Sequence, residues 1–296
     1  MKQKNGGHIF AVINSGVFVI LAFITLYPFI NILALSLNDA VDTMAGGIFF
    51  WPRIWSLDSY YVIFKHNSLV SAFLMSVART VAGTVLSILG ASIMGYVLTK
   101  KYLVGYKFFY MLFIISMFLN VGLLPSYMLY KNLHIYDTFA VYILPGLVGV
   151  FYLILFRTYF LQLPASLEES AYIDGANEFQ VFIRVMLPLS APILATVGLF
   201  IAVGQWNSWT DTLYFTTDDR LETLQYVLMK ILRQAEAAQM VNSAEMDMLR
   251  RKKLIKISPD SVKMAITIVA TLPILLVYPF LQKYFIKGMT IGAVKG

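Results

Sequence analysis

Long apolar runs separated by short polar stretches set the pattern of this chain. A helix that crosses a membrane needs about 20 mostly apolar residues, and six runs reach or approach that length. The pattern therefore predicts an all-α membrane protein in which residues 1–296 form one transmembrane domain with six spans, so that both termini lie on the same side. The predicted spans are residues 9–37, 68–99, 108–130, 138–156, 189–210 and 264–282.

Small residues and prolines add detail to these spans. In the second span, small side chains recur at steps of four, which lets another helix approach this face closely. These residues are Gly83, Ser87, Ala91 and Gly95. In the fourth span, Pro145 and Gly146 predict a kink that neighbouring helices can accommodate. The third span is expected to form one helix.

Two loops carry patterns of their own. The loop 38–66 contains Trp51 and Trp55, which are typical of an anchor at the membrane interface, although they could also pack beneath the loop. The long loop 211–263 contains a predicted helix that Asp219 and Glu222 would cap. Its apolar face, at helical spacing, consists of Leu221, Leu224, Leu228, Ile231, Leu232 and Ala235.

The polar segment 164–188 lies between the fourth and fifth spans. Ser166 and Glu169 have the spacing of a capping box, in which a hydroxyl and a carboxylate satisfy backbone N–H groups at the start of a helix. This spacing predicts a short helix that begins near Leu167.

A tight turn and a second helix are predicted to follow. Gly175 can adopt the positive φ that ends a helix at low cost. Asn177 and Gln180 repeat the capping pattern, and the second helix is expected to continue to Pro188. The segment would form a helix-turn-helix projection beside the membrane.

Composition narrows the classes of function. The chain is 59% hydrophobic and 13% charged, with a mean hydropathy of +0.72, whereas soluble domains are nearer a quarter charged. The absence of cysteine excludes thiolate metal sites, catalytic thiols and disulfides. The three histidines are far apart, so neither a metal site nor a cofactor is expected. No G-x-x-x-x-G-K-[ST] pattern occurs, so any ATP would be hydrolysed by another subunit and the chain is not expected to be an enzyme.

The segment 164–188 also carries a family resemblance. Glu169-Ser170-Ala171 is followed after three residues by Gly175, and nine further residues lead to Val185-Met186-Leu187-Pro188. This spacing resembles the EAA loop of the permease subunits of bacterial ABC importers, whose pattern is E-A-A, three residues, G, nine residues, I-x-L-P. Ser170 and Val185 depart from the pattern but keep size and polarity similar.

The resemblance implies a type I ABC importer permease fold in which segment 164–188 forms the cytoplasmic coupling helix that sits in a groove of the ATPase. The implied coupling residues are Glu169, Ser170, Ala171, Asp174, Gly175, Leu187 and Pro188. The long loop and the tail 287–296 resemble the maltose-type second permease and the oligosaccharide permeases of Gram-positive bacteria. The implied partners are a homologous permease, two ATPase subunits and an extracytoplasmic solute-binding protein, which the loop 211–263 would contact.

The distribution of Lys and Arg indicates the orientation. Ten basic residues lie on the side of the termini and segment 164–188, and three lie in the two short opposite loops. These three are Arg53, Lys65 and Lys131. Nine further basic residues in the loop 211–263 argue against this orientation, and the family resemblance decides in favour of cytoplasmic termini in a bacterial plasma membrane.

Polar residues within the spans are the candidates for the substrate path. Arg79 lies inside the second span, where a charge either faces a cavity or partner or extends to the interface. Sugars are bound by aromatic faces together with amide groups, and an indole between two amides offers both chemistries. The candidate residues are Arg79, Asn120, Gln205, Trp206 and Asn207. An acidic sugar is one extension, because Arg79 and the basic loop would favour an anion.

Other classes of transport protein remain as alternatives. An ABC permease could carry a solute other than a sugar. A secondary transporter or channel would work without ATP, but secondary carriers usually have carboxylates within their spans, and the predicted spans contain no Asp or Glu.

Overall fold

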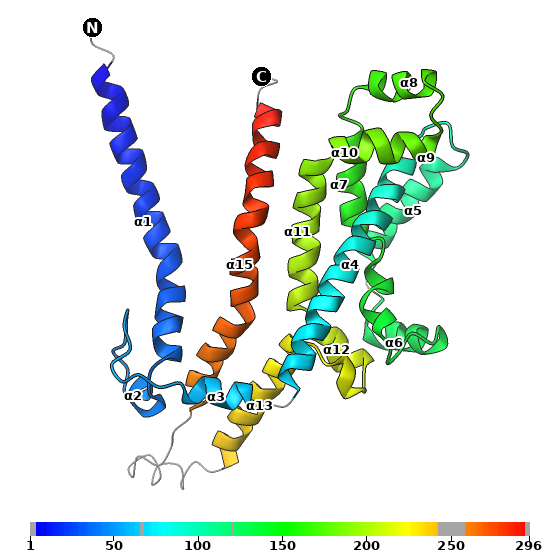
Figure 1. The fold of residues 1–296 in the computed structure, drawn as a ribbon. Coiled ribbons are helices and arrows are strands. Elements are labelled where there is room, and N and C mark those ends of the chain that lie inside the picture. Colours follow the sequence, from blue (N-terminus) through cyan, green and yellow to red (C-terminus); the bar gives the residue numbers. More distant parts are fainter. Residues whose placement is uncertain (1–3, 66–67, 120, 242–257, 294–296) are drawn as a thin grey trace. The chain divides into compact units, whose positions relative to one another are not determined.

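The computed structural model describes residues 4–65, 68–119, 121–241 and 258–293, and within these ranges its regular structure is helical apart from one isolated bridge between Asn38 and Trp55 (Figure 1). The chain divides into two compact units. Unit 1 consists of Met1–Leu69 and Leu228–Pro273, and unit 2 consists of Val70–Val227 and Ile274–Gly296.

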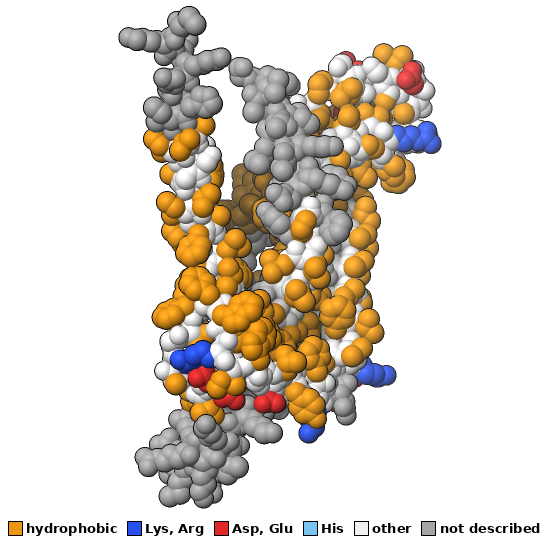
Figure 2. All heavy atoms as spheres, turned by 60° about the vertical axis from the view of Figure 1, so that its left-hand side comes forward, with side chains coloured by type: hydrophobic (Ala, Val, Ile, Leu, Met, Phe, Trp, Pro, Cys, Tyr) orange, Lys and Arg blue, Asp and Glu red, His pale blue; other side chains and the backbone are white. Residues whose placement is uncertain are grey.

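Unit 1 begins with the longest apolar helix of the N-terminal half. Within it, Phe10–Ser36 is a stretch of 27 residues apolar enough to cross a membrane, and hydrophobic side chains cover it in Figure 2. The helices that lie wholly in this unit are α1 (Lys4–Ser36), α2 (Ala40–Met44) and α3 (Asp58–Phe64). The helices α13 (Leu224–Val241) and α15 (Pro259–Ala293) contribute to both units.

Unit 2 contains the middle of the chain. Its helices up to the polar segment are α4 (Leu69–Val97), α5 (Tyr106–Phe118), α6 (Leu123–Asn132), η1 (Phe139–Tyr142), η2 (Leu144–Gly146) and α7 (Val150–Phe160). From the polar segment onward they are α8 (Ala165–Ile173), α9 (Glu178–Val181), η3 (Phe182–Met186), α10 (Leu187–Leu189), α11 (Ala191–Asn207), α12 (Thr210–Phe215) and η4 (Asp219–Leu221).

The core of unit 2 forms where α4, α7 and α11 meet the second half of the polar segment. Its fully buried side chains include Leu153, Phe156, Val181 and Val197. Because lipid is as apolar as these side chains, close packing holds the spans together, and the same cluster packs segment 164–188 against them.

The small-residue face of α4 packs against α7 and the turn before it. A Cβ on Gly95 would lie 2.9 Å from Cβ of Phe156, so a larger residue would displace α7. Ser87 Oγ donates a hydrogen bond to the carbonyl oxygen of Gly146 at 3.0 Å. The partner of this face is therefore α7 and its preceding turn, except at Gly83, where an added Cβ would lie 2.8 Å from the side chain of Gln205 in α11.

The predicted spans agree with helices to different degrees. Three helical stretches are long and apolar enough to cross a membrane, namely Phe10–Ser36, Leu69–Val97 and Pro259–Val277, and two bent helix pairs raise the number to five among the described residues. The prediction of one helix over 108–130 was wrong, because the chain leaves the helix between α5 and α6. Leu119 takes an extended conformation directly after α5, and Gly122, with φ +79° and ψ 173°, directly precedes α6.

The two bent pairs correspond to the fourth and fifth predicted spans. The kink expected at Pro145 and Gly146 is present, as the 3-10 turns η1 and η2 meet α7 at 46°. The helix α7 passes Arg157 and ends at Phe160, beyond the expected boundary. The run Glu178–Leu189 meets α11 at 81°.

Candidate functional site

The first helix of the polar segment begins earlier than its sequence indicated. The helix α8 starts at Ala165 with Pro164 in the N-cap position, and no side chain caps it. The predicted capping box of Ser166 and Glu169 is therefore wrong. Ser166 lies inside the helix, where its carbonyl oxygen accepts a hydrogen bond from Ser170 Oγ at 2.8 Å.

The turn after α8 has the predicted left-handed glycine. Gly175 has φ +82°, and its N–H donates to the carbonyl oxygen of Tyr172 at 3.0 Å. The N–H of Ala176 donates to the carbonyl oxygen of Ala171, also at 3.0 Å. These two bonds form a Schellman motif, which satisfies carbonyl groups at the helix end. No atom lies within 4 Å of a Cβ added to Gly175, so the need for glycine is conformational.

The second predicted cap is confirmed. Asn177 Oδ1 accepts from the N–H of Gln180 at 2.9 Å, and Gln180 Oε1 accepts from the N–H of Asn177 at 3.0 Å. This reciprocal pair is the capping box. It starts α9, and a π-helical turn, η3, continues it.

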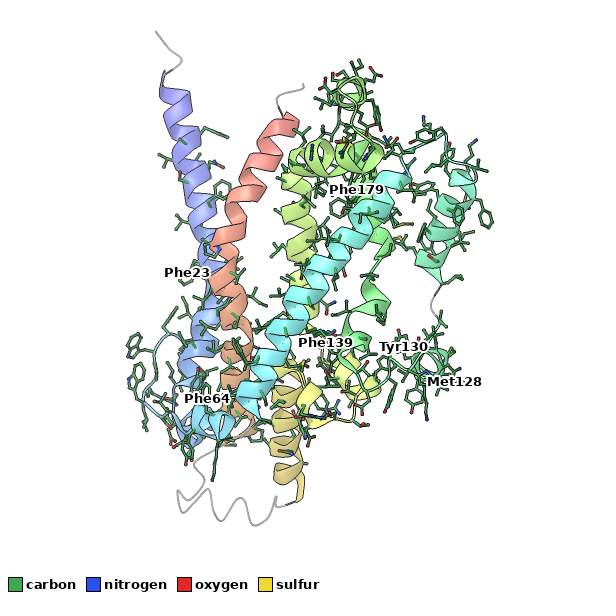
Figure 3. All side chains as sticks on the ribbon, turned by 45° about the vertical axis from the view of Figure 1, so that its right-hand side comes forward. Phe23, Phe64, Met128, Tyr130, Phe139 and Phe179 are labelled. Atoms are coloured by element: carbon green, nitrogen blue, oxygen red, sulfur yellow. The ribbon has the colours of Figure 1, made fainter. Side chains whose placement is uncertain are left out.

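The second half of the polar segment has a buried side and an exposed side. Phe182 and Met186 are buried in the core of unit 2, whereas Phe179 is 66% exposed and is marked beside α9 in Figure 3. Ile173 at the end of α8 is 87% exposed. Figure 1 shows α8 and the run from α9 to α10 lying across one end of α4, α7 and α11. The segment thus presents apolar side chains at the end of the helical bundle.

The implied coupling residues occupy several of these elements. Glu169, Ser170 and Asp174 are exposed on α8 and its end. Ala171 and Leu187 are half-buried against the core. Pro188 is exposed in α10, close to the bend that leads into α11.

A cluster around Lys100 ties the polar segment to the end of α4. Lys100 is 8% exposed, and its Nζ lies 2.6 Å from Glu168 Oε2 and 3.5 Å from Glu178 Oε2. The same atom donates to the hydroxyl of Tyr172 at 3.2 Å and lies 4.5 Å from the ring centroid of Tyr96. One ammonium group therefore bridges α8 and α9 with two carboxylates.

Hydrogen bonds set the charge states of this cluster. Burial acts to lower the pKa of Lys100, but hydrogen bonds with Glu168 and Tyr172 and the two nearby carboxylates raise that pKa above its ordinary value. Burial acts to raise the pKa of Glu178, but hydrogen bonds from Tyr102 and Tyr172 and the charge of Lys100 lower it overall. The Tyr102 hydroxyl donates to Glu178, which raises the pKa of Tyr102 to about 12.

Sequence reasoning did not identify this cluster. Lys100 was counted as a membrane-flanking charge, and Glu168 was not singled out, because 68 residues separate the two. A basic residue directly after a span and a pair of carboxylates within the polar segment are the signals that the sequence offers.

A second polar cluster lies around Arg79 in α4. Arg79 is 2% exposed, and its guanidinium forms an ion pair with Asp211 of α12. Its Nε donates to Gln205 Oε1 at 2.8 Å, and Nη1 donates to the carbonyl oxygen of Ser208 at 3.3 Å. Its Cζ lies 4.5 Å from the ring centroid of Tyr142. The side chain is therefore buried inside the protein, and its charge is already paired.

The other candidates for the substrate path are distributed around the end of α11. Gln205 belongs to the Arg79 cluster, and Trp206 is 7% exposed and packs edge-on against Phe73 at 5.9 Å between ring centroids. Asn207 is exposed. Asn120 lies outside the described residues.

The loop helix has the predicted apolar face but a different start. Leu221, Leu224, Leu228 and Ile231 are buried, in agreement with the spacing. Asp219 begins the short turn η4, which Asp218 caps by accepting from the N–H of Arg220, and α13 begins only at Leu224. The basic residues 250–253 lie outside the described residues.

Comparison with known proteins places these features in a wider group. A family model described as "Binding-protein-dependent transport system inner membrane component" matches residues 17–291. Protein LplC of Bacillus subtilis is 36% identical over 100% of this chain and 98% of its own length. The polygalacturonan/rhamnogalacturonan transport system permease protein YtcP of the same organism is 35% identical over 95% of this chain and 96% of its own length.

A solved structure is similar over nearly the whole chain. It is a crystal structure of a bacterial ABC transporter involved in the import of the acidic polysaccharide alginate. The two chains superpose with a TM-score of 0.78 and 27% sequence identity, over 95% of this chain and 98% of the other. They therefore share one fold.

Proposed function

We propose that this chain, which belongs to the family of binding-protein-dependent transport system inner membrane components, carries an oligosaccharide across the membrane. It is a multi-pass membrane protein with the type I ABC importer permease fold. The observation that carries the choice of substrate is the similarity, over nearly the full length, to permeases for polygalacturonan/rhamnogalacturonan and alginate.

The polar segment 164–188 is the part of the chain that would couple transport to ATP hydrolysis. Its exposed apolar side chains, Ile173 and Phe179, suit a groove on an ATPase subunit, while Phe182 and Met186 hold the segment to the spans. ATP would be bound by the partner ATPase subunits, and the chain itself would need no cofactor. A second permease and a binding protein complete the importer.

The substrate path would pass the end of α11. Asn207 is exposed, so its amide can contact a sugar directly, and the buried Trp206 and the half-buried Gln205 hold that helix end in place. Arg79 positions the same end through Gln205 and Ser208. Asn120 belongs to the proposal on sequence grounds.

An acidic oligosaccharide is favoured over a neutral one. The support comes from the transporter described for acidic alginate. Arg79 gives no additional support, since Asp211 already neutralises its charge.

Transport by the complete importer in lipid vesicles tests the proposal. Uptake of uronic-acid oligosaccharides and neutral oligosaccharides of equal length would be compared, with Asn207→Ala and with Trp209→Ala as the control at the same helix end. We expect uptake of the uronic-acid oligosaccharide, lowered severalfold by Asn207→Ala and little affected by Trp209→Ala. Failure to transport any oligosaccharide would reject the substrate class, and equal uptake of both kinds would reject the acidic preference.

A further inference from the structure

A loop rich in aromatic side chains folds back along α1 (Figure 1). Residues 46–55, which we call the aromatic loop, read Gly-Gly-Ile-Phe-Phe-Trp-Pro-Arg-Ile-Trp. Asn31, inside α1, donates from Nδ2 to the carbonyl oxygens of Ile48 and Phe49, both at 2.9 Å. Asn31 precedes the end of α1 by five residues, which is about 8 Å of helix at 1.5 Å per residue. The loop therefore lies beside the apolar helix, not beyond its end.

The ring of Phe50 reaches deeper than the loop backbone. Its centroid lies 5.3 Å from that of Tyr27 and 6.2 Å from that of Phe23. Phe23 is the middle residue of the apolar stretch Phe10–Ser36, as its position along α1 in Figure 3 also shows. When α1 spans a bilayer, the Phe50 ring is therefore at the depth of the hydrocarbon core.

The exposed surface of the loop is apolar at its tip. Trp51 and Trp55 contact each other edge-on, with ring centroids 5.6 Å apart. Figure 2 shows hydrophobic side chains over this end of α1 with charged side chains below them. The large side chains of the loop with half or more of their surface exposed are Phe49, Phe50, Trp51, Ile54 and Trp55.

Backbone polar groups decide how deep such a loop can lie, since a group without a partner in hydrocarbon costs several kcal/mol. The two carbonyl groups next to α1 are bonded to Asn31. Nearer the base of the loop, Asn38 Oδ1 accepts from the N–H groups of Arg53 and Ile54, both at 2.9 Å. The loop thus satisfies its two carbonyl groups next to α1 and two N–H groups at its base without a second protein.

The single charge of the loop is held at its base. Arg53 Nε donates to Asp42 Oδ2 at 3.0 Å, and Nη2 donates to the carbonyl oxygen of Gly46 at 2.6 Å. Hydrogen bonding from Asn38, together with Arg53, lowers the pKa of Asp42, which keeps this carboxylate charged. The loop is therefore amphipathic, with an ionic base and an aromatic tip.

We propose that the aromatic loop is a membrane anchor, with its ionic base at the level of the lipid headgroups and the rings of Phe49, Phe50 and Trp51 inserted among the acyl chains. Trp and Tyr concentrate at membrane interfaces because their rings are amphipathic. The anchor would hold the end of α1 at a fixed depth in its leaflet. The partner of this surface is lipid.

Spin labelling in the complete importer in liposomes tests this. The chain has no cysteine, so a nitroxide can be placed at Phe49→Cys, which keeps the Phe50 ring. Controls are Ile20→Cys, 60% exposed on α1, and Val104→Cys, 99% exposed in the connection after α4. We expect the label at Phe49→Cys to meet oxygen more often than a water-soluble nickel complex, as at Ile20→Cys and opposite to Val104→Cys.

Two results would overturn the proposal. Nickel accessibility equal to that of Val104→Cys would place the loop in water, and inaccessibility to both reagents would mean that a protein subunit covers it.

A second measurement, of tryptophan fluorescence, needs no substitution in the loop. In the Trp206→Phe/Trp209→Phe chain, the remaining tryptophans are Trp51 and Trp55, and brominated lipid should quench their emission. Unchanged emission would contradict insertion.

Discussion

At the scale of single residues, charge and backbone conformation determine where substitution is costly. The buried Arg79 is compatible with an apolar helix because Asp211, Gln205 and a backbone carbonyl occupy its donors. An isolated charge in a low-dielectric interior would cost far more than this arrangement does. The residue is thus a structural tie between α4, α11 and α12.

Asp211→Asn should destabilise the subunit by on the order of 1–3 kcal/mol, because it leaves the Arg79 guanidinium buried without its counter-charge. Asp218→Asn is the matched control, since the partner of Asp218, Arg220, has a side chain 89% exposed and surface pairs contribute little. Thermal unfolding of the purified importer measures both. Equal midpoints for Asp211→Asn and wild type would show that the pair is not important for stability.

Gly175→Leu should abolish uptake and substrate-stimulated ATP hydrolysis while the subunit still inserts. The left-handed conformation costs a branched residue roughly 1–2 kcal/mol, and relaxing it would change the angle between α8 and α9. Gly175→Asn is the control, because Asn adopts this conformation more readily. Wild-type uptake in Gly175→Leu vesicles would refute the assigned role of the turn.

Among these residues, those with local interactions were predictable from sequence. Gly175 and the cap of Asn177 with Gln180 depend on neighbours within five residues, and the structure confirms them. The Ser166 cap failed although its spacing was correct, because the preceding proline already occupies the N-cap. The partner of Arg79 is 132 residues away, and no local pattern indicates it.

At the scale of elements, the Lys100 cluster connects the two helices of the polar segment to α4. Glu168 belongs to α8 and Glu178 to α9, so their shared cation holds both helices in one position. Without it, two carboxylates would face each other, and like charges repel. The attachment of the segment therefore depends on charge as well as on the apolar core.

Lys100→Met should lower uptake severalfold while part of the ATP hydrolysis persists, because the docking surface would move independently of α4. Lys100→Arg should retain uptake. The neighbouring Lys101 is exposed, so Lys101→Met controls for the loss of a positive charge. Parallel measurements of uptake and hydrolysis give the ratio of sugar moved to ATP used. A ratio unchanged by Lys100→Met would rule out this positioning role.

The contribution of the cluster should be constant between about pH 6 and pH 9. The lowered pKa of Glu178 means that its contribution is present above its ordinary value of 4.5 and is lost as the pH falls through the lowered value. The raised pKa of Lys100 means that its contribution is present below 10.5 and is lost as the pH rises through the raised value. The difference in unfolding temperature between wild type and Lys100→Met should thus not vary in this window. A clear trend would assign the effect to another group.

Element type was predictable where the apolar pattern was long and continuous. The spans expected at 9–37 and 68–99 became α1 and α4 with ends shifted by one to five residues. The span at 108–130 did not form one helix. Gly122 adopts a positive φ at the break, as glycine can at low cost. The apolar pattern on either side would be the same for a continuous helix, so the sequence could not distinguish the two cases. The expectation of an ABC importer permease, which relied on segment 164–188, is confirmed by the family match.

At the scale of the whole molecule, orientation in the membrane remains a prediction that labelling can test. Single cysteines would be placed at Val104, Ile173 and Arg220, each more than four-fifths exposed. In intact cells, an impermeant maleimide should label Arg220→Cys and neither of the others. In permeabilised cells Val104→Cys should also react, as should Ile173→Cys once the ATPase subunits have been removed. Labelling of Ile173→Cys from outside would invert the topology and remove the ATPase from segment 164–188.

The 81° bend between the polar segment and α11 has a mechanical consequence. Ser190, fully buried at the corner, donates from Oγ to the carbonyl oxygen of Met186 at 2.7 Å. The run Glu178–Leu189 and α11 are therefore expected to rotate together, as two segments joined at a fixed angle. The 17 residues of α11 span about 25 Å. A rotation of about 10° at the bend would therefore displace the far end of α11 by about 4 Å. A small rotation at the nucleotide side would reach Asn207 as a displacement of roughly one hydrogen-bond length or more.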